Sequence, residues 1–212
     1  IGTINIPGEW LVSKEGLSQG MINGILQDRE GYMWFATKDG LNKYDGYKFT
    51  VYRHNPDDSY SLPENYVTSI FEDDNNNFWV STLSLGVYLF DKSSERFFPV
   101  QLTPAERIPD NNTIISLWFQ HNRMLIQKNT NLLIYDISSL HPADYSSKFS
   151  EKIKCVFNYN QVQKNDDYKF LFSFQKNHVV SWLPDGSVWI KYTDTLLCAM
   201  PGFNSKDWVL KG

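Results

Sequence analysis

One stretch of the chain occurs twice: residues 17–37 read LSQGMINGILQDREGYMWFAT, and residues 62–82 read LPENYVTSIFEDDNNNFWVST. Leu17, Asp28 and Trp34 each recur 45 residues later. A repeat of about 40–50 residues is typical of β-propellers, in which every blade is a sheet of four strands. The repeat therefore predicts an all-β chain built from propeller blades of four antiparallel strands.

The pattern within the first copy fits a blade. Short apolar or aromatic runs predict strands at residues 21–27, 32–37, 40–45 and 47–52. Residues 28–31 predict a turn in which Gly31 takes a positive φ. The second copy has Asn76 at this place, and asparagine tolerates the same conformation. No segment shows a sustained helical period, so we expect little helix.

The rest of the chain repeats less cleanly. His121-Asn122 predicts a tight turn, and the stretch around Trp189 restores the signature of the first two copies. Trp79 and Trp189 lie 110 residues apart, which exceeds two periods and predicts an insertion of roughly 20 residues around residues 138–151. The apolar runs predict strands at residues 114–119, 123–127, 132–136, 153–159 and 168–174.

These patterns divide the chain into about four blades. We expect an excerpt of a larger, seven-bladed propeller, because propellers close with about four to eight blades and the last blade here ends raggedly. The approximate ranges are 16–61, 62–106, 107–175 with the insertion, and a partial blade at 176–212.

The amino-acid composition limits the classes of partner that the chain can bind. Aromatic residues make up 16% of the 212 residues, the formal net charge is −4, and no Lys/Arg-rich run occurs, which argues against nucleic acid or anionic lipid as a partner. No apolar stretch is long enough to span a bilayer, so we expect no direct membrane insertion of this segment, and the first residues show no signal-peptide pattern. Cys155 and Cys198 are interpreted as small buried residues, with a disulfide between them as the alternative.

Several runs carry a family likeness: residues 16–19 (GLSQ), 25–28 (ILQD), 31–37 (GYMWFAT) and 39–49 (DGLNKYDGYKF). Together they resemble the two-component regulator propeller repeat, and especially the first blade of the sensor region in Bacteroides-type hybrid two-component systems. The likeness is strong over residues 16–98, moderate over 179–190 and weak between them. One departure is Ala36, where the family commonly has glycine.

The resemblance implies a periplasmic sensor. In such proteins, propeller repeats precede an immunoglobulin-like domain, a membrane span, a histidine kinase and a response regulator, and the ligands are oligosaccharides from polysaccharide breakdown. None of these later modules is visible in the sequence, so any kinase activity would belong to a missing part of a longer chain. A homodimer, or contact with a neighbouring propeller or immunoglobulin-like domain, is compatible with this interpretation.

No catalytic, cofactor or metal site is expected. The four histidines (His54, His121, His141 and His178) share no motif spacing. The run at residues 73–77 superficially resembles a calcium loop but lacks the glycine and the final acidic ligand of an EF-hand. The carboxylate pairs Glu72-Asp73 and Asp166-Asp167 fall in predicted turns, where solvated charge is the default.

The recurring tryptophans, Trp34, Trp79 and Trp189, are expected to pack between adjacent blades; stacking on a sugar is the alternative. Better ligand candidates lie where the loop between the second and third strands meets the connection that enters the next inner strand. Both open on one face of a propeller, near its channel. The ligand-binding candidates are Lys38, Asp39, Asn65 and Tyr66.

Two other classes of function stay open. A propeller-type carbohydrate-active enzyme would need carboxylates or histidines from several blades to converge on one pocket. A protein-interaction scaffold is the other alternative, although the WD40 and kelch signatures are absent from the sequence.

Overall fold

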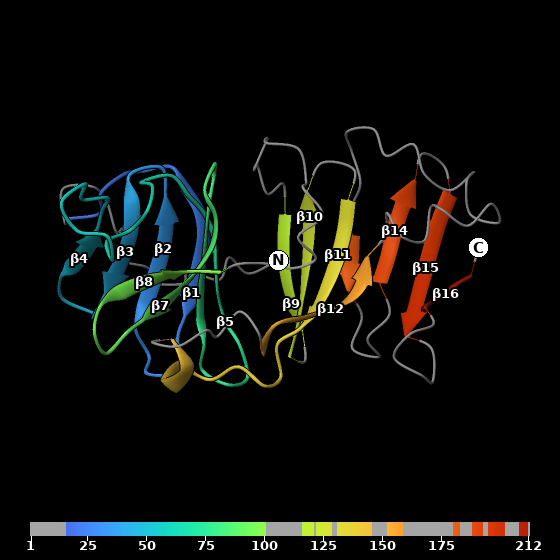
Figure 1. Cartoon of the computed structure of the whole chain (residues 1–212). Coiled ribbons are helices and arrows are strands. Elements are labelled where there is room, and N and C mark those ends of the chain that lie inside the picture. The colour runs from blue at the N-terminus through green and yellow to red at the C-terminus, as the bar shows by residue number, and fades with distance from the viewer. Residues whose placement is uncertain are drawn as a thin grey trace, which may run out of the picture.

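The computed structural model describes residues 16–100, 116–120, 122–128, 131–145 and 152–158, and the strand backbones of a final sheet. Figure 1 shows four sheets that follow one another along the chain, from blue to red. In each sheet the strands lie in sequence order, and all neighbours are antiparallel. These are the four-stranded meanders of propeller blades, so the predicted all-β fold class is confirmed.

The first two sheets follow the two copies of the repeat. The first contains β1 (Ile22–Gln27), β2 (Met33–Thr37), β3 (Gly40–Tyr44) and β4 (Phe49–Tyr52). The second contains β5 (Val67–Glu72), β6 (Phe78–Thr82), β7 (Gly86–Asp91) and β8 (Arg96–Pro99). Both inner strands carry a register irregularity at the same place, between Ile22 and Gly24 in β1 and between Val67 and Ser69 in β5.

The third sheet is formed by β9 (Ser116–Gln120), β10 (Arg123–Lys128), β11 (Asn131–Asp136) and β12 (Lys154–Asn158). The fourth is formed by β13 (Val180–Trp182), β14 (Val188–Tyr192), β15 (Thr195–Pro201) and β16 (Trp208–Lys211). The predicted strand at 168–174 and the side chains of Cys155, Trp189 and Cys198 lie outside the described residues.

The first core lies between sheets one and two. Trp34 is fully buried, and its ring contacts Tyr52 from its own sheet and Phe78 and Phe90 from the next. Burying a large aromatic ring stabilises a fold by several kcal/mol, and tilted ring contacts add to that. The expectation that this tryptophan packs between blades is confirmed.

The second core joins sheets two and three. Trp79 is fully buried and packs 5.2 Å, centroid to centroid, from Phe119 in β9. Phe71 in β5 stacks on the same Phe119 ring at 4.3 Å, nearly parallel. Met124 and Tyr135 of the third sheet belong to the same buried cluster. The repeated tryptophan therefore has the same role at each of these two seams.

The predicted insertion lies between β11 and β12. Their connection spans residues 137–153, whereas the matching turns in the first two sheets need only residues 45–48 and 92–95. Its described part contains a short 3-10 turn, η2 (Pro142–Asp144), which lies beneath the second sheet in Figure 1. We call residues 137–145 the strap, because they reach from the third sheet back to the second.

Asparagines in the β5–β6 turn hold the strap. The Asn75 side-chain amide donates to the carbonyls of Ser138 and Leu140 at 3.0 and 3.1 Å. The Asn77 amide also donates to the Leu140 carbonyl, at 2.9 Å, and the Tyr145 hydroxyl donates to Asn77 Oδ1 at 2.9 Å. These bonds tie the strap of the third sheet to the β5–β6 turn of the second.

Positive φ occurs where the repeat predicts it: Gly31 has a φ of 91° and Asn76 one of 66°. Gly40 is more restricted, because its φ is 117° and a Cβ there would lie 2.5 Å from the Tyr52 carbonyl oxygen. Only glycine fits that position without distortion.

Candidate functional site

The four ligand candidates meet on one face of the first two sheets. We call it the upper face, after its place in Figure 1; it contains the β2–β3 loop, the β6–β7 loop and the connection 53–66. The Lys38 ammonium lies 5.3 Å from the centroid of the Tyr66 ring. The Gly40 amide donates to the Asn65 carbonyl at 2.8 Å, which holds the two loops together.

Asp39 and Asn65 already have protein partners. Asp39 pairs with Arg53 at 3.0 Å, and both side chains are about half exposed, at 41% and 48%. Asn65 Oδ1 accepts the backbone amide of His54 at 2.7 Å. These two side chains therefore shape the connection, while exposed Lys38 and half-buried Tyr66 present a cation and an aromatic ring beside it. The role of all four in binding stays a prediction.

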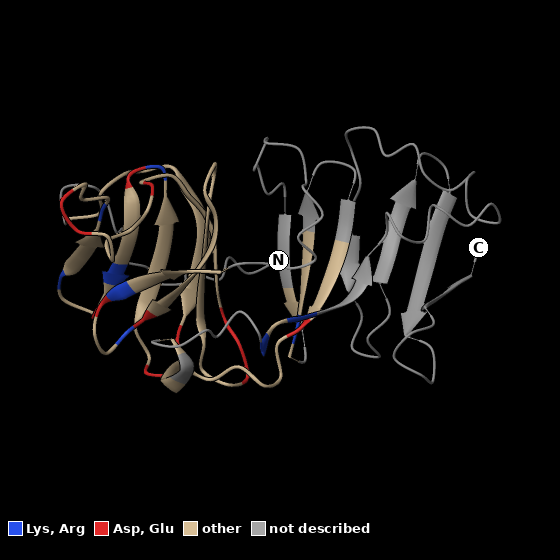
Figure 2. Ribbon diagram, in the orientation of Figure 1, with Lys and Arg blue, Asp and Glu red and all other residues tan. Residues whose placement is uncertain are grey.

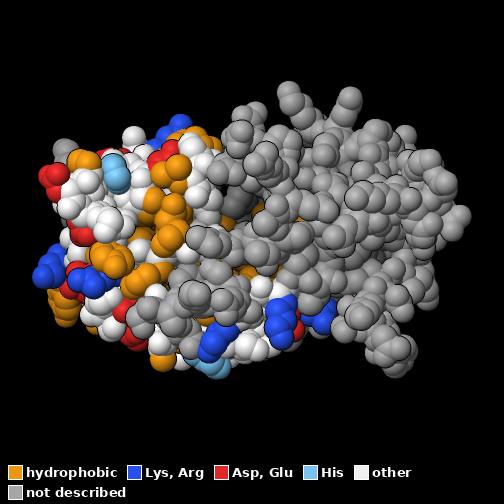
Figure 3. Space-filling model, viewed as in Figure 1, with side chains coloured by type: hydrophobic (Ala, Val, Ile, Leu, Met, Phe, Trp, Pro, Cys, Tyr) orange, Lys and Arg blue, Asp and Glu red, His pale blue; other side chains and the backbone are white. Residues whose placement is uncertain are grey.

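Apolar side chains lie next to Tyr66. The amide of Leu83 donates to the Tyr66 carbonyl at 3.0 Å, and the Leu83 and Leu85 side chains are 37% and 51% exposed. Met21 and Ile22, at the start of β1, are also exposed. The space-filling view in Figure 3 shows hydrophobic side chains on the surface of the first two sheets. This surface combines an aromatic ring and apolar side chains with polar loops. It therefore suits a ligand that has both apolar C–H faces and hydroxyl groups.

The opposite, lower face contains a feature that sequence reasoning missed, a buried aspartate that serves each tryptophan. Asp28 Oδ2 accepts the Trp34 indole N–H at 2.8 Å, and its Oδ1 accepts the amides of Glu30 and Tyr32. In the second blade, Asp73 Oδ2 likewise accepts the Trp79 indole N–H at 2.9 Å. The signal was present, because each aspartate precedes its tryptophan by six residues in both copies.

Asp73 and Glu72 correct an expectation. Their turn position suggested solvated charge, yet Asp73 is 3% exposed and the Glu72 side chain 4%. Burial raises the pKa of Asp73, and hydrogen bonds from Asn77 and Trp79 oppose that rise. The other pair, Asp166-Asp167, lies outside the described residues.

The turn that resembles a calcium loop uses its carboxylate internally. Asp73 accepts the amides of Asn75 and Asn77 at Oδ1, and the Asn77 side chain and Trp79 at Oδ2. Over the described residues, no group of three or more His, Cys, Asp or Glu side chains is arranged to hold a metal ion.

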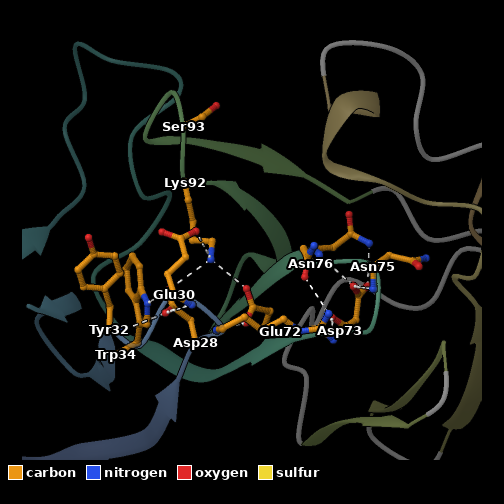
Figure 4. Close-up of polar contacts among 12 residues, drawn as sticks. Asp28, Glu30, Tyr32, Trp34, Glu72, Asp73, Asn75, Asn76, Lys92 and Ser93 are labelled. Carbon is orange, nitrogen blue, oxygen red and sulfur yellow. Dashed lines mark hydrogen bonds and ion pairs between the residues drawn. The ribbon is translucent and has the colours of Figure 1, made fainter.

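Lys92, in the β7–β8 turn, neutralises the buried carboxylates. Figure 4 shows its ammonium between Asp28, Glu30 and Glu72, at distances of 3.3, 2.9 and 2.9 Å. Burial alone would lower the pKa of Lys92, but hydrogen bonds with Glu72 and Glu30 and the neighbouring negative charges raise it to about 12. The ion pairs of this lysine therefore link the β7–β8 turn of the second blade to carboxylates of both blades.

Arg29 makes a second bridge between the same blades. Its guanidinium donates to the carbonyls of Asp73 and Asp74 and to Asn76 Oδ1, at 2.9–3.1 Å. Its backbone amide donates to Glu72 at 2.8 Å. In Figure 2 many of the ribbon positions coloured for Lys, Arg, Asp and Glu lie in the turns and at the strand ends of these two sheets.

A cavity of about 510 Å³ opens on the lower face beside these bridges. It lies between the blade turns, the ends of β3 and β7, and the strap. The residues that line it are Arg29, Glu30, Lys43, Glu72, Asn76, Phe90, Asp91, Lys92, Ser93, Pro142 and Tyr145. Sequence reasoning did not find it, because its walls come from three separate parts of the chain.

The histidines do not gather in either place. His54 Nδ1 lies 3.0 Å from the Leu62 carbonyl oxygen, within the upper connection. His141 is exposed on the strap. His121 and His178 lie outside the described residues.

Comparison with known proteins identifies the repeated unit. A family model described as "Two component regulator propeller" matches residues 16–39 and 61–84. These segments are similar to two-component regulator propeller repeats. Each match runs from the entry of an inner strand to the β2–β3 or β6–β7 loop, and so includes the aspartate and the tryptophan. The first match also includes Lys38.

Related proteins place the repeats in longer chains. Histidine kinase P4 of Formosa agariphila is 52% identical over 48 residues, which are 23% of this chain and 4% of that protein. The extracellular domain of the putative hybrid two component system BT3049 from B. thetaiotaomicron matches 95% of this chain and 31% of its own, at 17% identity and a TM-score of 0.53. The extracellular domain of the putative hybrid two component system BT4673 from the same organism matches 85% of this chain and 24% of its own, at 17% identity and a TM-score of 0.60.

The fold also occurs outside these systems. PorZ of Porphyromonas gingivalis, a surface component of the type-IX secretion system, matches 88% of this chain and 26% of its own, at 12% identity and a TM-score of 0.57. The chain thus spans about a third or less of the proteins it matches, and the structural likeness shows the β-propeller fold. Within the described residues, no helix has the length and apolar character needed to cross a bilayer.

Proposed function

We propose that this chain is the sensing part of a hybrid two-component signalling protein, and that it binds its ligand outside the cytoplasm. The observation that carries the proposal is the pair of two-component regulator propeller repeats, in a fold shared with extracellular domains of such systems. The strong local identity to a histidine kinase supports the same interpretation.

The proposed ligand is an oligosaccharide from polysaccharide breakdown, bound at the upper face. Tyr66 offers a ring on which a pyranose can stack, and Lys38 offers a donor beside it. Asp39 remains 41% exposed in its ion pair with Arg53, so its carboxylate can also accept a hydrogen bond from a sugar hydroxyl. The exposed leucines Leu83 and Leu85 extend the apolar surface. Such a site needs no chemistry of its own, so we propose no catalytic activity for the chain itself.

Kinase activity would then belong to other parts of the full-length protein, which we place in the inner membrane with this chain in the periplasm. A neighbouring propeller or immunoglobulin-like domain, or a second copy of the protein, would carry the signal onward.

Calorimetric titration tests the binding site. The protein expressed from its complete gene is titrated with a panel of glycan fragments, alongside Tyr66→Ala and Tyr47→Ala. Tyr47 is a matched control, because it is 94% exposed in the β3–β4 turn of the lower face. We expect one fragment class to bind, with affinity reduced at least about tenfold in Tyr66→Ala and unchanged in Tyr47→Ala. Silence across the panel would count against a glycan ligand.

The likeness to PorZ favours a second candidate, an interaction scaffold at the cell surface. A scaffold would bind a protein through the same exposed upper face without responding to glycans. A propeller-type carbohydrate-active enzyme is the third candidate, because titratable groups do line the lower cavity. Hydrolysis of a panel glycan, lost in Glu30→Gln, would favour it.

A further inference from the structure

The lower cavity has the size of a ligand site. At about 510 Å³ it falls within the range of roughly 300–1,000 Å³ that is usual for small-molecule pockets. Its wall combines apolar groups, Phe90 of β7 and Pro142 and Tyr145 of the strap, with charged groups from both blades. The strap is held by Asn75 and Asn77, so this wall is built into the fold.

One cation in the wall has no anionic partner within the described part of the chain. The Lys43 ammonium lies over the rings of Tyr32, at 3.8 Å from the centroid, and Trp34, at 5.6 Å. Among the described residues, this ammonium forms no hydrogen bond or ion pair with an oxygen. Lys92, by contrast, is fully paired with carboxylates. The half-buried Lys43 therefore keeps its N–H donors for another group.

One carboxylate also has unused capacity. Glu30 contacts Lys92 through Oε1, and within the described part of the chain its Oε2 has no partner. Its side chain is 57% exposed. The cavity lining holds three cations and three carboxylates, so its charge is balanced and favours a ligand that carries at most a single net charge.

We propose that this cavity binds a small monocarboxylate that also carries a hydroxyl or ammonium group. Its carboxylate accepts hydrogen bonds from Lys43, its donor group binds Glu30, and its carbon skeleton lies against Phe90, Pro142 and Tyr145. The site is separate from the upper face and goes beyond the proposed function, so either can fail without the other.

Titration calorimetry on the protein expressed from its complete gene tests the proposal with two probes. D-gluconate supplies hydroxyls as donors, and L-phenylalanine supplies an ammonium. We expect saturable binding of at least one probe, weakened about tenfold or more in Lys43→Met because a charge-assisted hydrogen bond is lost. Which probe binds decides between a hydroxy acid and an amino acid.

Three variants locate the site. Lys43→Arg keeps the cation and should bind within about threefold of the wild type, which separates charge from misfolding. Lys48→Met removes an exposed cation from the β3–β4 turn and should change nothing. Tyr66→Ala, on the upper face, should also leave binding intact. Absence of binding for both probes, or wild-type affinity in Lys43→Met, overturns the proposal.

Discussion

The buried aspartate of the second blade should be essential for stability, and Asp73→Asn tests this without changing its size. Asp73 Oδ2 accepts two buried donors, the Asn77 amide at 2.8 Å and the Trp79 indole at 2.9 Å. Oδ1 accepts two backbone amides at 2.9 Å. An asparagine has one acceptor oxygen, so its amide nitrogen would face one pair of donors.

The cost follows from those contacts. A hydrogen bond to a charged acceptor contributes about 1.5–3 kcal/mol, and a buried donor left unpaired costs about 1–3 kcal/mol. Part of this is returned, because the burial that raises the pKa of Asp73 makes a neutral side chain easier to bury. We expect Asp73→Asn to lower the free energy of unfolding of the full chain by about 2–4 kcal/mol, or the melting temperature by roughly 5–12 °C.

Equilibrium urea unfolding followed by circular dichroism measures this cost. Asp74→Asn is the control, because Asp74 is 62% exposed and pairs with Arg29 only at 3.5 Å; it should stay within about 0.5 kcal/mol of the wild type. Trp79→Phe removes the indole donor, so the double variant should show a coupling of about 1–2 kcal/mol with Asp73→Asn. If Asp73→Asn matches the wild type, or if the two effects simply add, the aspartate–tryptophan bond does not hold the blade.

Three further predictions follow from the same two faces. Lys92→Met leaves Glu72 and Asp28 buried without their cation and should cost about 2–4 kcal/mol at neutral pH. Folding raises the pKa of Lys92 from 10.5 to about 12, so its contribution to stability is fully present below pH 10.5 and is lost as the pH rises toward 12. The unfolding free energies of the wild type and the variant should therefore converge over that pH range. A constant difference between them would be evidence against the pairing. Gly40→Ala and Gly46→Ala both place alanine at positive φ, at a cost of about 1–2 kcal/mol, but only the alanine at position 40 also meets a carbonyl oxygen. Thermal unfolding should therefore give Gly40→Ala a clearly lower melting temperature than Gly46→Ala. Equal melting temperatures would contradict the close approach. Asn75→Ala removes both hydrogen bonds from this side chain to the strap and should speed hydrogen exchange at the Leu140 amide. The control Asn23→Ala breaks a bond to the Val67 carbonyl and should leave that exchange rate unchanged. Equal exchange in the wild type and both variants would mean that Asn75 does not hold the strap.

Much of the fold could be predicted from the sequence because its signals are local and periodic. The strands of the first sheet lie within a residue or two of the predicted ranges, and the positive φ of Asn76 was visible from its alignment with Gly31. The upper-face candidates also meet as expected, since the connection into β5 and the β2–β3 loop necessarily lie at the same end of a meander.

The lower face could not be predicted, for two physical reasons. Lys92 has no counterpart in the first blade, where Gly46 takes the aligned place, so repetition gave it no signal. Its partners Asp28 and Glu72 come from different turns, and their burial depends on how two blades pack. The strap was located by its extra length, but its docking on Asn75 and Asn77 is a long-range contact that a polar turn does not reveal.

The central claim is that this propeller receives a signal for a two-component system, and one measurement tests it most directly. The protein expressed from its complete gene is incubated with labelled ATP, with and without the glycan class that binds, and incorporated phosphate is followed over time. The account predicts phosphorylation whose rate changes with ligand and no longer responds in Tyr66→Ala. Phosphorylation that is indifferent to a bound ligand, or a complete protein that incorporates no phosphate, would contradict it.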